Sequence, residues 1–279
     1  MCGNAALGGH LDIIKWAREI GCKWGFTLIR AAKIGRLDII QWAIQNGCEW
    51  NLLVISEAAE HGHLHILEWA AENKYQIFEI CADAAKGNHF EVLKWARKQG
   101  CRWSTWVCAE AAGHGNLEML KWARENGCPW NEETCKLAAR QNKFEVLKWA
   151  RENGCPWNVE ICAIAACNNY MDILQWPREN GATWDEKTCW DAASNGNLEM
   201  LKWSRENGCP WNEKTCEKAA EGGHLQVLIW ARENGCPWDA RTIYAARLMS
   251  CSEVEEWAIE NGCKWTEEGY EEYLEQRFN

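Results

Sequence analysis

The sequence predicts an all-α fold, an α-solenoid of about ten helix-turn-helix repeats. A tryptophan recurs in steps of 26 or 27 residues, at Trp16, Trp42, Trp69, Trp95, Trp122, Trp149, Trp176, Trp203, Trp230 and Trp257. Such a fixed period is typical of solenoids, in which each unit buries its apolar face against the next. Within each copy the apolar residues follow helical spacing. Leucine-rich repeats have a similar period, but their short strand motif is absent, so we reject that class.

The first helix of each repeat is predicted from the copy at residues 131–157. Asn131 is a favourable N-cap residue, and the two glutamates that follow place negative charge where the helix dipole favours it. One helical stripe is formed by Cys135, Ala138, Ala139 and Asn142. Most other copies carry glycine at the last of these positions, and glycine or asparagine there ends a helix and opens a tight turn.

The second helix of this copy is predicted from about Phe144 to Asn153. Gly154 ends it, and Pro156 prevents its continuation into the loop. A second tryptophan, here Trp157, follows the first by eight residues in nearly every copy. Each repeat is therefore expected to be an antiparallel helix pair followed by a short loop.

The segments CKLAARQNKFEVLKW (135–149) and EKAAEGGHLQVLIW (217–230) resemble the helix pair and the Gly-His turn of the ankyrin family. The chain is similar to the short, tryptophan-rich ankyrin-like arrays of protist and large DNA virus proteins. It departs from the family because each repeat is about six residues shorter than the usual length of about 33. The missing residues fall where ankyrins carry a β-hairpin finger, so the resemblance implies shortened loops with little or no finger.

Residues 1–265 are expected to form a single ankyrin-like solenoid of ten repeats. Its first repeat is truncated, because Met1 enters in the middle of a first helix. Residues 266–279 keep the register of a first helix but are polar and lack a second one, which predicts a C-terminal capping helix. The abrupt start resembles a fragment. An adaptor domain before Met1, such as an F-box, would make the array the substrate receptor of a ubiquitin ligase.

Composition excludes several classes of partner. The formal net charge is -10, and lysines and arginines are scattered singly, whereas nucleic-acid binding rests on clustered positive charge. No apolar run approaches the roughly 18 residues of a membrane span, and no signal peptide opens the chain. The 17 cysteines are odd in number, and the chain is too large to need disulfides. We therefore expect a monomer in the cytoplasm or nucleus that is not secreted and has neither a nucleic-acid nor a membrane partner.

The repeated tryptophans and cysteines are interpreted as buried core. A tryptophan can bury about 150 to 250 Å², and both positions match buried aliphatic positions of the ankyrin pattern. Paired cysteines stand seven residues apart, unlike zinc ligands, which are typically separated by two to four residues. The HxHxH run at 61–65 coincides with the Gly-His turn of the resembled family. We predict no metal, no cofactor and no enzymatic activity, because a nucleophile elbow, a P-loop and an HExxH motif are all absent.

Candidate partner-binding residues are those that differ between copies. Trp106 and Trp190 fit neither tryptophan register, which makes them candidates for exposed binding anchors. A second set, here called the helix-one row, directly precedes the Ala-Ala pair of each first helix and consists of Arg30, Glu57, Asp83, Glu110, Leu137, Ile164, Asp191, Lys218 and Tyr244. The ankyrin resemblance implies that this row lines a concave, partner-facing side.

We expect a non-enzymatic scaffold or adaptor that binds another protein through the helix-one row and the loop tips. Two alternatives of other classes stay open. One is a small-ligand reader that stacks glycans on exposed tryptophans, and the other is a store of thiols or metal.

Overall fold

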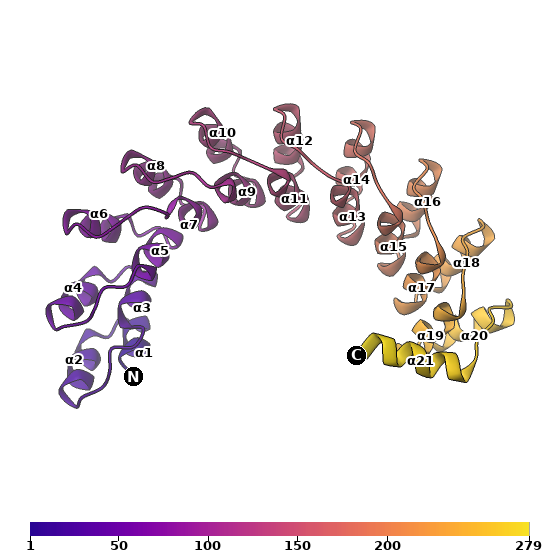
Figure 1. Ribbon diagram of the computed structural model, residues 1–279, viewed down its shortest axis with the longest axis horizontal. Coiled ribbons are helices and arrows are strands. Elements are labelled where there is room, and N and C mark those ends of the chain that lie inside the picture. Colours follow the sequence, from indigo (N-terminus) through magenta and orange to yellow (C-terminus); the bar gives the residue numbers. More distant parts are fainter. Residues whose placement is uncertain (279) are drawn as a thin grey trace. The chain divides into compact units, whose positions relative to one another are not determined.

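The computed structural model describes residues 1–278, which contain 21 helices and no strand. The chain divides into two compact units, Met1–Cys155 and Pro156–Asn279. In each unit the helices follow one another as pairs joined by short turns (Figure 1). Each pair consists of a helix one and a helix two. The predicted all-α fold of about ten helix-turn-helix repeats with shortened loops is confirmed for these residues.

The first unit contains six helix pairs. Its helices one are α1 (Cys2–Leu7), α3 (Thr27–Lys33), α5 (Leu53–Glu60), α7 (Cys81–Lys86), α9 (Thr105–His114) and α11 (Glu132–Arg140). Its helices two are α2 (Leu11–Glu19), α4 (Leu37–Gln45), α6 (Leu64–Glu72), α8 (Phe90–Lys98), α10 (Leu117–Glu125) and α12 (Phe144–Glu152).

The second unit contains four helix pairs and a final helix. Its helices one are α13 (Glu160–Cys167), α15 (Glu186–Ser194), α17 (Glu213–Glu221) and α19 (Ala240–Leu248). Its helices two are α14 (Met171–Glu179), α16 (Leu198–Glu206), α18 (Leu225–Glu233) and α20 (Ser252–Glu260). The final helix is α21 (Glu267–Phe278), which has 12 residues. Over residues 1–278, no helix combines the length and the apolar character needed to cross a bilayer.

Local signals set the bounds of each pair, as α11 and α12 show. The Asn131 side chain accepts a hydrogen bond from the backbone N–H of Glu133 at 3.2 Å, so α11 begins at the predicted N-cap. Asn142 adopts a left-handed backbone with φ of 55° and turns the chain into α12. Gly154, with φ of 84°, follows the end of α12. The predicted caps and turn are therefore confirmed.

The core of each unit lies between helix one and helix two of successive pairs. In α11 and α12, Cys135, Ala138, Ala139, Leu147 and Ala150 have no exposed surface. Small alanines let neighbouring helices one pack closely, and consecutive helices one are in contact within each unit. Helices two touch one another much less. The space between successive helices two is where the repeated tryptophans pack.

The repeated tryptophans pack against one another from pair to pair. The loop residue Trp130 meets Trp149 of the next helix two edge-on, with ring centroids 6.1 Å apart. The Arg124 guanidinium lies 4.0 Å from the centre of the Trp130 ring, which adds a cation–π contact. The same edge-on arrangement recurs in Trp24–Trp42, Trp103–Trp122, Trp157–Trp176, Trp184–Trp203, Trp211–Trp230 and Trp238–Trp257.

The interpretation of these tryptophans as buried core is too strong. They are half-buried, and Trp16 is 52% exposed. The tryptophans are less buried than expected because they pack between successive helices two, at the edge of the core, where part of each ring stays open to solvent. Arginine side chains cover some of that surface instead of apolar groups. The stretch LKWARENGCPWN, which stands at 120–131 within the first unit, therefore links one helix pair to the next.

Candidate interaction surface

The helix-one row lies on half-buried positions of the helices one, with Tyr244 as the exception. Each member directly precedes a pair of fully or nearly fully buried alanines, so the backbone of the row is fixed by the core. The side chains of the row differ in charge and size from pair to pair. A rigid support with variable side chains is the arrangement that a binding surface requires.

In the first unit, the acidic members of the row interact with one another. Burial raises the pKa of Asp83, and the neighbouring carboxylates of Glu60 and Glu57 add to this effect, while a hydrogen bond from Ser56 opposes it. Lys86, whose Nζ lies 2.9 Å from Glu60 Oε2, is close enough to respond to the charge of Asp83. A carboxylate with a raised pKa on a binding surface favours a partner that brings positive charge or a hydrogen-bond donor.

The ends of the row in this unit are also connected. Arg30 and Glu57 line one hollow of about 350 Å³, together with Phe26. The charge of Glu110 reaches Lys86. The structure thus brings Arg30, Glu57, Asp83 and Glu110 into one surface, whereas Leu137 lies further along, beside Gly113 of α9.

In the second unit, Asp191 and Lys218 are electrostatic neighbours. Burial raises the pKa of the Asp191 carboxyl, and the positive charges of Lys187 and Lys218 partly offset this rise. Lys218 Nζ also lies 2.5 Å from Glu221 Oε2 one turn along α17. Ile164 of α13 is half-buried.

Tyr244 does not lie on an open surface, in contrast to the sequence-based expectation. It is 6% exposed, and the rings of Tyr270 and Tyr273 lie 5.7 and 5.6 Å from its ring. Its hydroxyl donates a hydrogen bond to the backbone carbonyl of Thr266 at 3.1 Å. The reason is that α21 folds over this end of the row and covers it.

The two tryptophans outside the repeat register have different environments. Trp106, in the first turn of α9, is 51% exposed. Trp190 is half-buried, and its indole N–H donates to Asn212 Oδ1 at 2.8 Å. Lys214 Nζ lies 4.4 Å from the centre of the Trp190 ring. Of the two, Trp106 has the free ring surface that an exposed anchor needs, while Trp190 is held against the start of α17.

The first unit has a strip of exposed apolar side chains, most of which were not predicted from the sequence as binding residues. We call it the apolar strip, and it consists of Phe26, Leu52, Leu53, Phe78 and Trp106, which are 63, 57, 54, 59 and 51% exposed. These residues lie at or shortly before the first turn of α3, α5, α7 and α9. At the same place α11, α15 and α17 begin with a glutamate. Comparing the copies at their helix starts, instead of at the Ala-Ala pair, would have revealed the strip.

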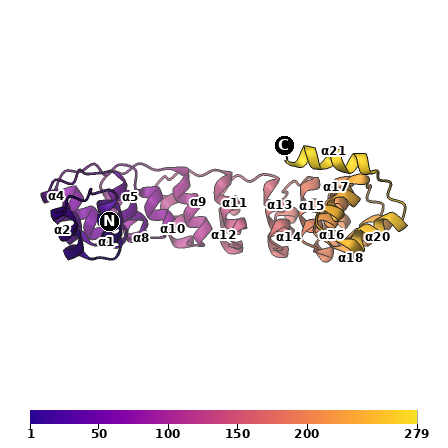
Figure 2. The same cartoon turned by 90° about the horizontal axis from the view of Figure 1, so that it is seen from below.

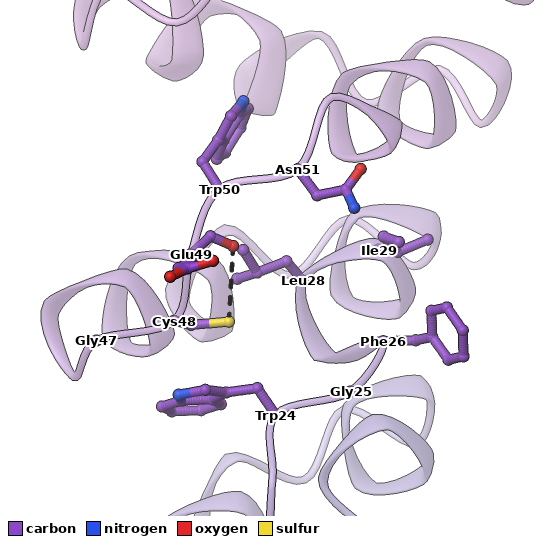
Figure 3. Close-up of a pocket in the computed structure, with 10 residues that line it drawn as sticks. All are labelled: Trp24, Gly25, Phe26, Leu28, Ile29, Gly47, Cys48, Glu49, Trp50 and Asn51. Carbon is purple, nitrogen blue, oxygen red and sulfur yellow. Dashed lines mark hydrogen bonds between the residues drawn. The ribbon is translucent and has the colours of Figure 1, made fainter.

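Hollows lie along the apolar strip. One of about 440 Å³ is lined by Trp24, Phe26 and Trp50, among others (Figure 3). In Figure 3 the Phe26 ring points away from the rings of both tryptophans. Another hollow, of about 310 Å³, is lined by Leu52 and Phe78. Because Phe26 also lines the hollow that contains Arg30 and Glu57, the strip adjoins the helix-one row.

The cysteines are free, and 14 of the 17 are buried. Burial raises the pKa of the Cys162 thiol to about 12 and that of Cys263 to about 11, which opposes thiolate formation at these two positions. In the buried Cys81–Cys101 pair, the hydrogen bond between the thiols lowers the pKa of Cys101 to about 7. Loop cysteines also have a structural contact. The thiol of Cys155, for example, donates to the Asn131 carbonyl at 3.4 Å and ties the loop to the start of its own pair.

The histidines of the Gly-His turns contact the preceding turn. The Nε2 atoms of His63 and His65 lie 3.1 and 3.0 Å from the carbonyl oxygens of Lys33 and Gly35. His224 makes the same kind of contact with the Ser194 carbonyl at 3.0 Å. In the part of the chain described, His, Cys, Asp and Glu side chains form no cluster of three or more placed to hold a metal ion.

Comparison with known proteins does not assign the chain to a family. No family model matches it, and no curated protein matches it either. The resemblance to ankyrin repeats therefore rests on the residues quoted above.

Proposed function

We propose that this protein is a non-enzymatic, ankyrin-like interaction scaffold that binds another protein through its helix-one side. The observation that carries the proposal is the apolar strip beside the helix-one row of the first unit. Exposed apolar side chains that gather along one edge and are rimmed by charges are typical of protein-binding surfaces. A location in the cytoplasm or nucleus fits the free thiols, because a reducing compartment keeps cysteines unpaired.

The binding would be rigid on the side of this protein. The strip is attached to helices whose buried alanines fix the backbone, so little conformational entropy is lost when a partner docks. Burying one phenylalanine or leucine of the strip contributes about 1.5 to 3 kcal/mol. Two or three such anchors, together with the charged row as a polar rim, are enough for a specific interface.

A glycan reader receives less support. Among residues 1–278 the exposed tryptophans are Trp16 of α2 and Trp106 of α9, which belong to separate pairs. Stacking of successive sugars needs aromatic rings that lie next to one another.

Site-specific photocrosslinking tests the proposal. A benzoyl-phenylalanine residue replaces Leu52 of the strip or, as a matched control, Glu145, which is exposed on α12. The labelled chains are mixed with extract from the cells that make the protein. We expect a discrete protein adduct at Leu52 that is absent at position 145. Adding Phe26→Ser and Phe78→Ser should abolish this adduct while the melting temperature stays within a few degrees. Equal adducts at both positions, or adducts that survive in the strip variant, would contradict the proposal.

A further inference from the structure

Helix α21 reaches beyond the last helix pair. It begins at Glu267, directly after Thr266, whose hydroxyl accepts a hydrogen bond from the Gly269 backbone N–H at 3.1 Å. It then lies alongside α19 and reaches α17 (Figures 1 and 2). Tyr273 and Arg277 contact residues that precede them by 56 positions. A helix that only capped the stack would have no reason to contact α17.

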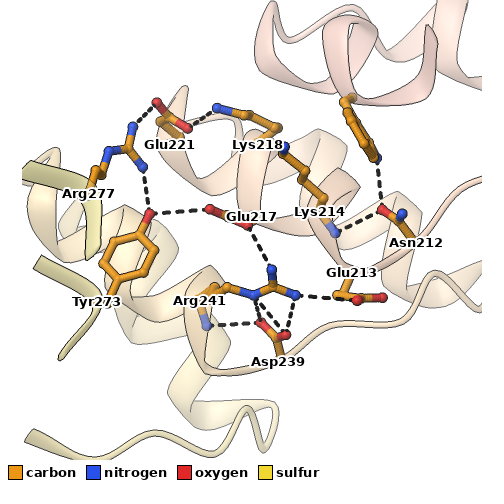
Figure 4. Close-up of polar contacts among 11 residues, drawn as sticks. Asn212, Glu213, Lys214, Glu217, Lys218, Glu221, Asp239, Arg241, Tyr273 and Arg277 are labelled. Carbon is orange, nitrogen blue, oxygen red and sulfur yellow. Dashed lines mark hydrogen bonds and ion pairs between the residues drawn. The ribbon is translucent and has the colours of Figure 1, made fainter. Parts of the chain in front are cut away.

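Two side chains of α21 each contact one glutamate of α17 (Figure 4). Tyr273 donates its hydroxyl proton to Glu217 Oε1 at 3.3 Å, and Arg277 Nη2 lies 2.5 Å from Glu221 Oε1. The two glutamates are one turn apart on α17, and so are the tyrosine and the arginine on α21. Burial would raise the pKa of Glu221, but hydrogen bonds from Lys218 and Arg277 outweigh it and hold that pKa below its usual value.

An aromatic contact accompanies these polar ones. Tyr270 and Tyr273 of α21 both pack on the Tyr244 ring of α19. Glu217, which is 7% exposed, lies next to this aromatic contact. The face of α17 and α19 therefore combines an aromatic surface, Tyr244, with two carboxylates, and α21 binds it through a tyrosine and an arginine.

Only a small part of α21 is buried against α17 and α19. Most of the helix is solvent-exposed, and its glutamates 268, 271, 272 and 275 point away from buried surface. An isolated helix of about 12 residues is only marginally stable in water, so α21 depends on this one face for its structure. Such elements open locally long before the whole domain unfolds.

We propose that α21 is an internal placeholder on the helix-one face of α17 and α19, and that a partner helix with an aromatic residue and an arginine one turn later exchanges with it. This inference rests on the proposed scaffold function and specifies its ligand in the second unit. The chemistry follows from the contacts that α21 makes. Residues 156–266, the part of the unit that remains when α21 leaves, carry 17 acidic and 10 basic side chains, which favours a basic helix over an acidic one.

The first test measures release of α21 in the full chain by hydrogen–deuterium exchange. The variant Tyr273→Ala with Arg277→Ala removes both contacts to α17, and Glu271→Ala with Glu275→Ala is the matched control on the exposed side of α21. We expect amides 270–277 to exchange at least about tenfold faster in the first variant and at the wild-type rate in the control. Equal exchange in the wild type and the first variant would show that α21 is not docked and would overturn the proposal.

The second test measures whether the released face binds a helix. The probe is a fluorescent peptide of residues 266–279, titrated into each full-length chain. We expect the released variant to bind it at least about tenfold more tightly than wild type, because the wild-type face is occupied. A peptide with both alanine substitutions should not bind. Equal binding to both chains, or none to the released variant, would overturn the proposal.

Concentration-dependent dimerisation of the wild type would also overturn it, because a second copy would then be the occupant. The strip cross-link at Leu52 lies in the first unit, so failure of that experiment and failure of these two are distinguishable.

Discussion

Replacing Trp130 with alanine tests the structural role of the repeated tryptophans. The substitution removes an edge-on contact with Trp149 and a cation–π contact with Arg124. A fully buried aromatic costs about 3 to 5 kcal/mol when it is truncated to alanine. Trp130 is only half-buried, so the transfer loss is about half of that, or about 2 kcal/mol. The aromatic pair and the cation–π contact each add about 0.5 to 1 kcal/mol, which brings the expected loss to about 3 to 4 kcal/mol.

The assay is equilibrium unfolding in urea, followed by far-UV circular dichroism. Trp106→Ala is the matched control, because it removes the same side chain from an exposed site in the same unit. Its stability should stay within about 0.5 kcal/mol of wild type. If both variants lose the same stability, or if Trp130→Ala loses less than the control, the account of the tryptophan joint is wrong.

Three further outcomes are expected. A thiol reagent should quickly label only three cysteines of the native chain, those that are not buried: Cys22, Cys167 and Cys251. Labelling of the other cysteines should require denaturant. Gly87→Ala should lower the free energy of unfolding in urea by about 1 to 3 kcal/mol, because the new Cβ would lie 1.9 Å from the Glu60 carbonyl oxygen. Gly113→Ala is the control and should not destabilise the chain, because its new Cβ would lie 3.4 Å from Leu137 Cβ. Arg277 of α21 helps to lower the pKa of Glu221 on α17, so the chain with α21 docked binds fewer protons than the chain with α21 released. Docking should therefore be strongest above about pH 5 and weaken as the pH falls below about 4, measured by amide exchange corrected for intrinsic rates. Unchanged protection of α21 down to pH 3 would show that the Glu221–Arg277 contact contributes nothing.

The helix pairs could be predicted from sequence because their signals are local. Asn131 caps α11 and Gly154 ends the next helix through backbone geometry that depends on a few neighbouring residues. The repeat period then extends each local prediction to the other copies. The stacking of the helices one followed from the same pattern, since small alanines recur at the contact.

The environment of individual side chains was harder to predict. Trp42 packs edge-on against Trp24 of the preceding loop, whereas Trp16 has no preceding loop tryptophan in this sequence and is 52% exposed. Tyr244 is covered by α21, and that cover depends on contacts which reach back as far as Glu217 and Glu221. The repeat register of residues 266–279 predicted a C-terminal capping helix but gave no sign of contacts with α17. Phe26 and its strip neighbours were present in the sequence as departures from the charged helix starts of later copies.

Repeated positions hold the fold, and we propose that non-repeated positions on the helix-one side bind partners. The most direct test is a saturation mutagenesis library of the full chain with two readouts, cellular abundance and photocrosslinking from Leu52. Substitutions at repeated positions such as Trp149 and Leu147 should lower both readouts together. Substitutions at Phe26, Phe78 and Arg30 should lower cross-linking while abundance stays at the wild-type level. Abundance that falls as steeply at these last three positions as at the repeated ones would contradict the account.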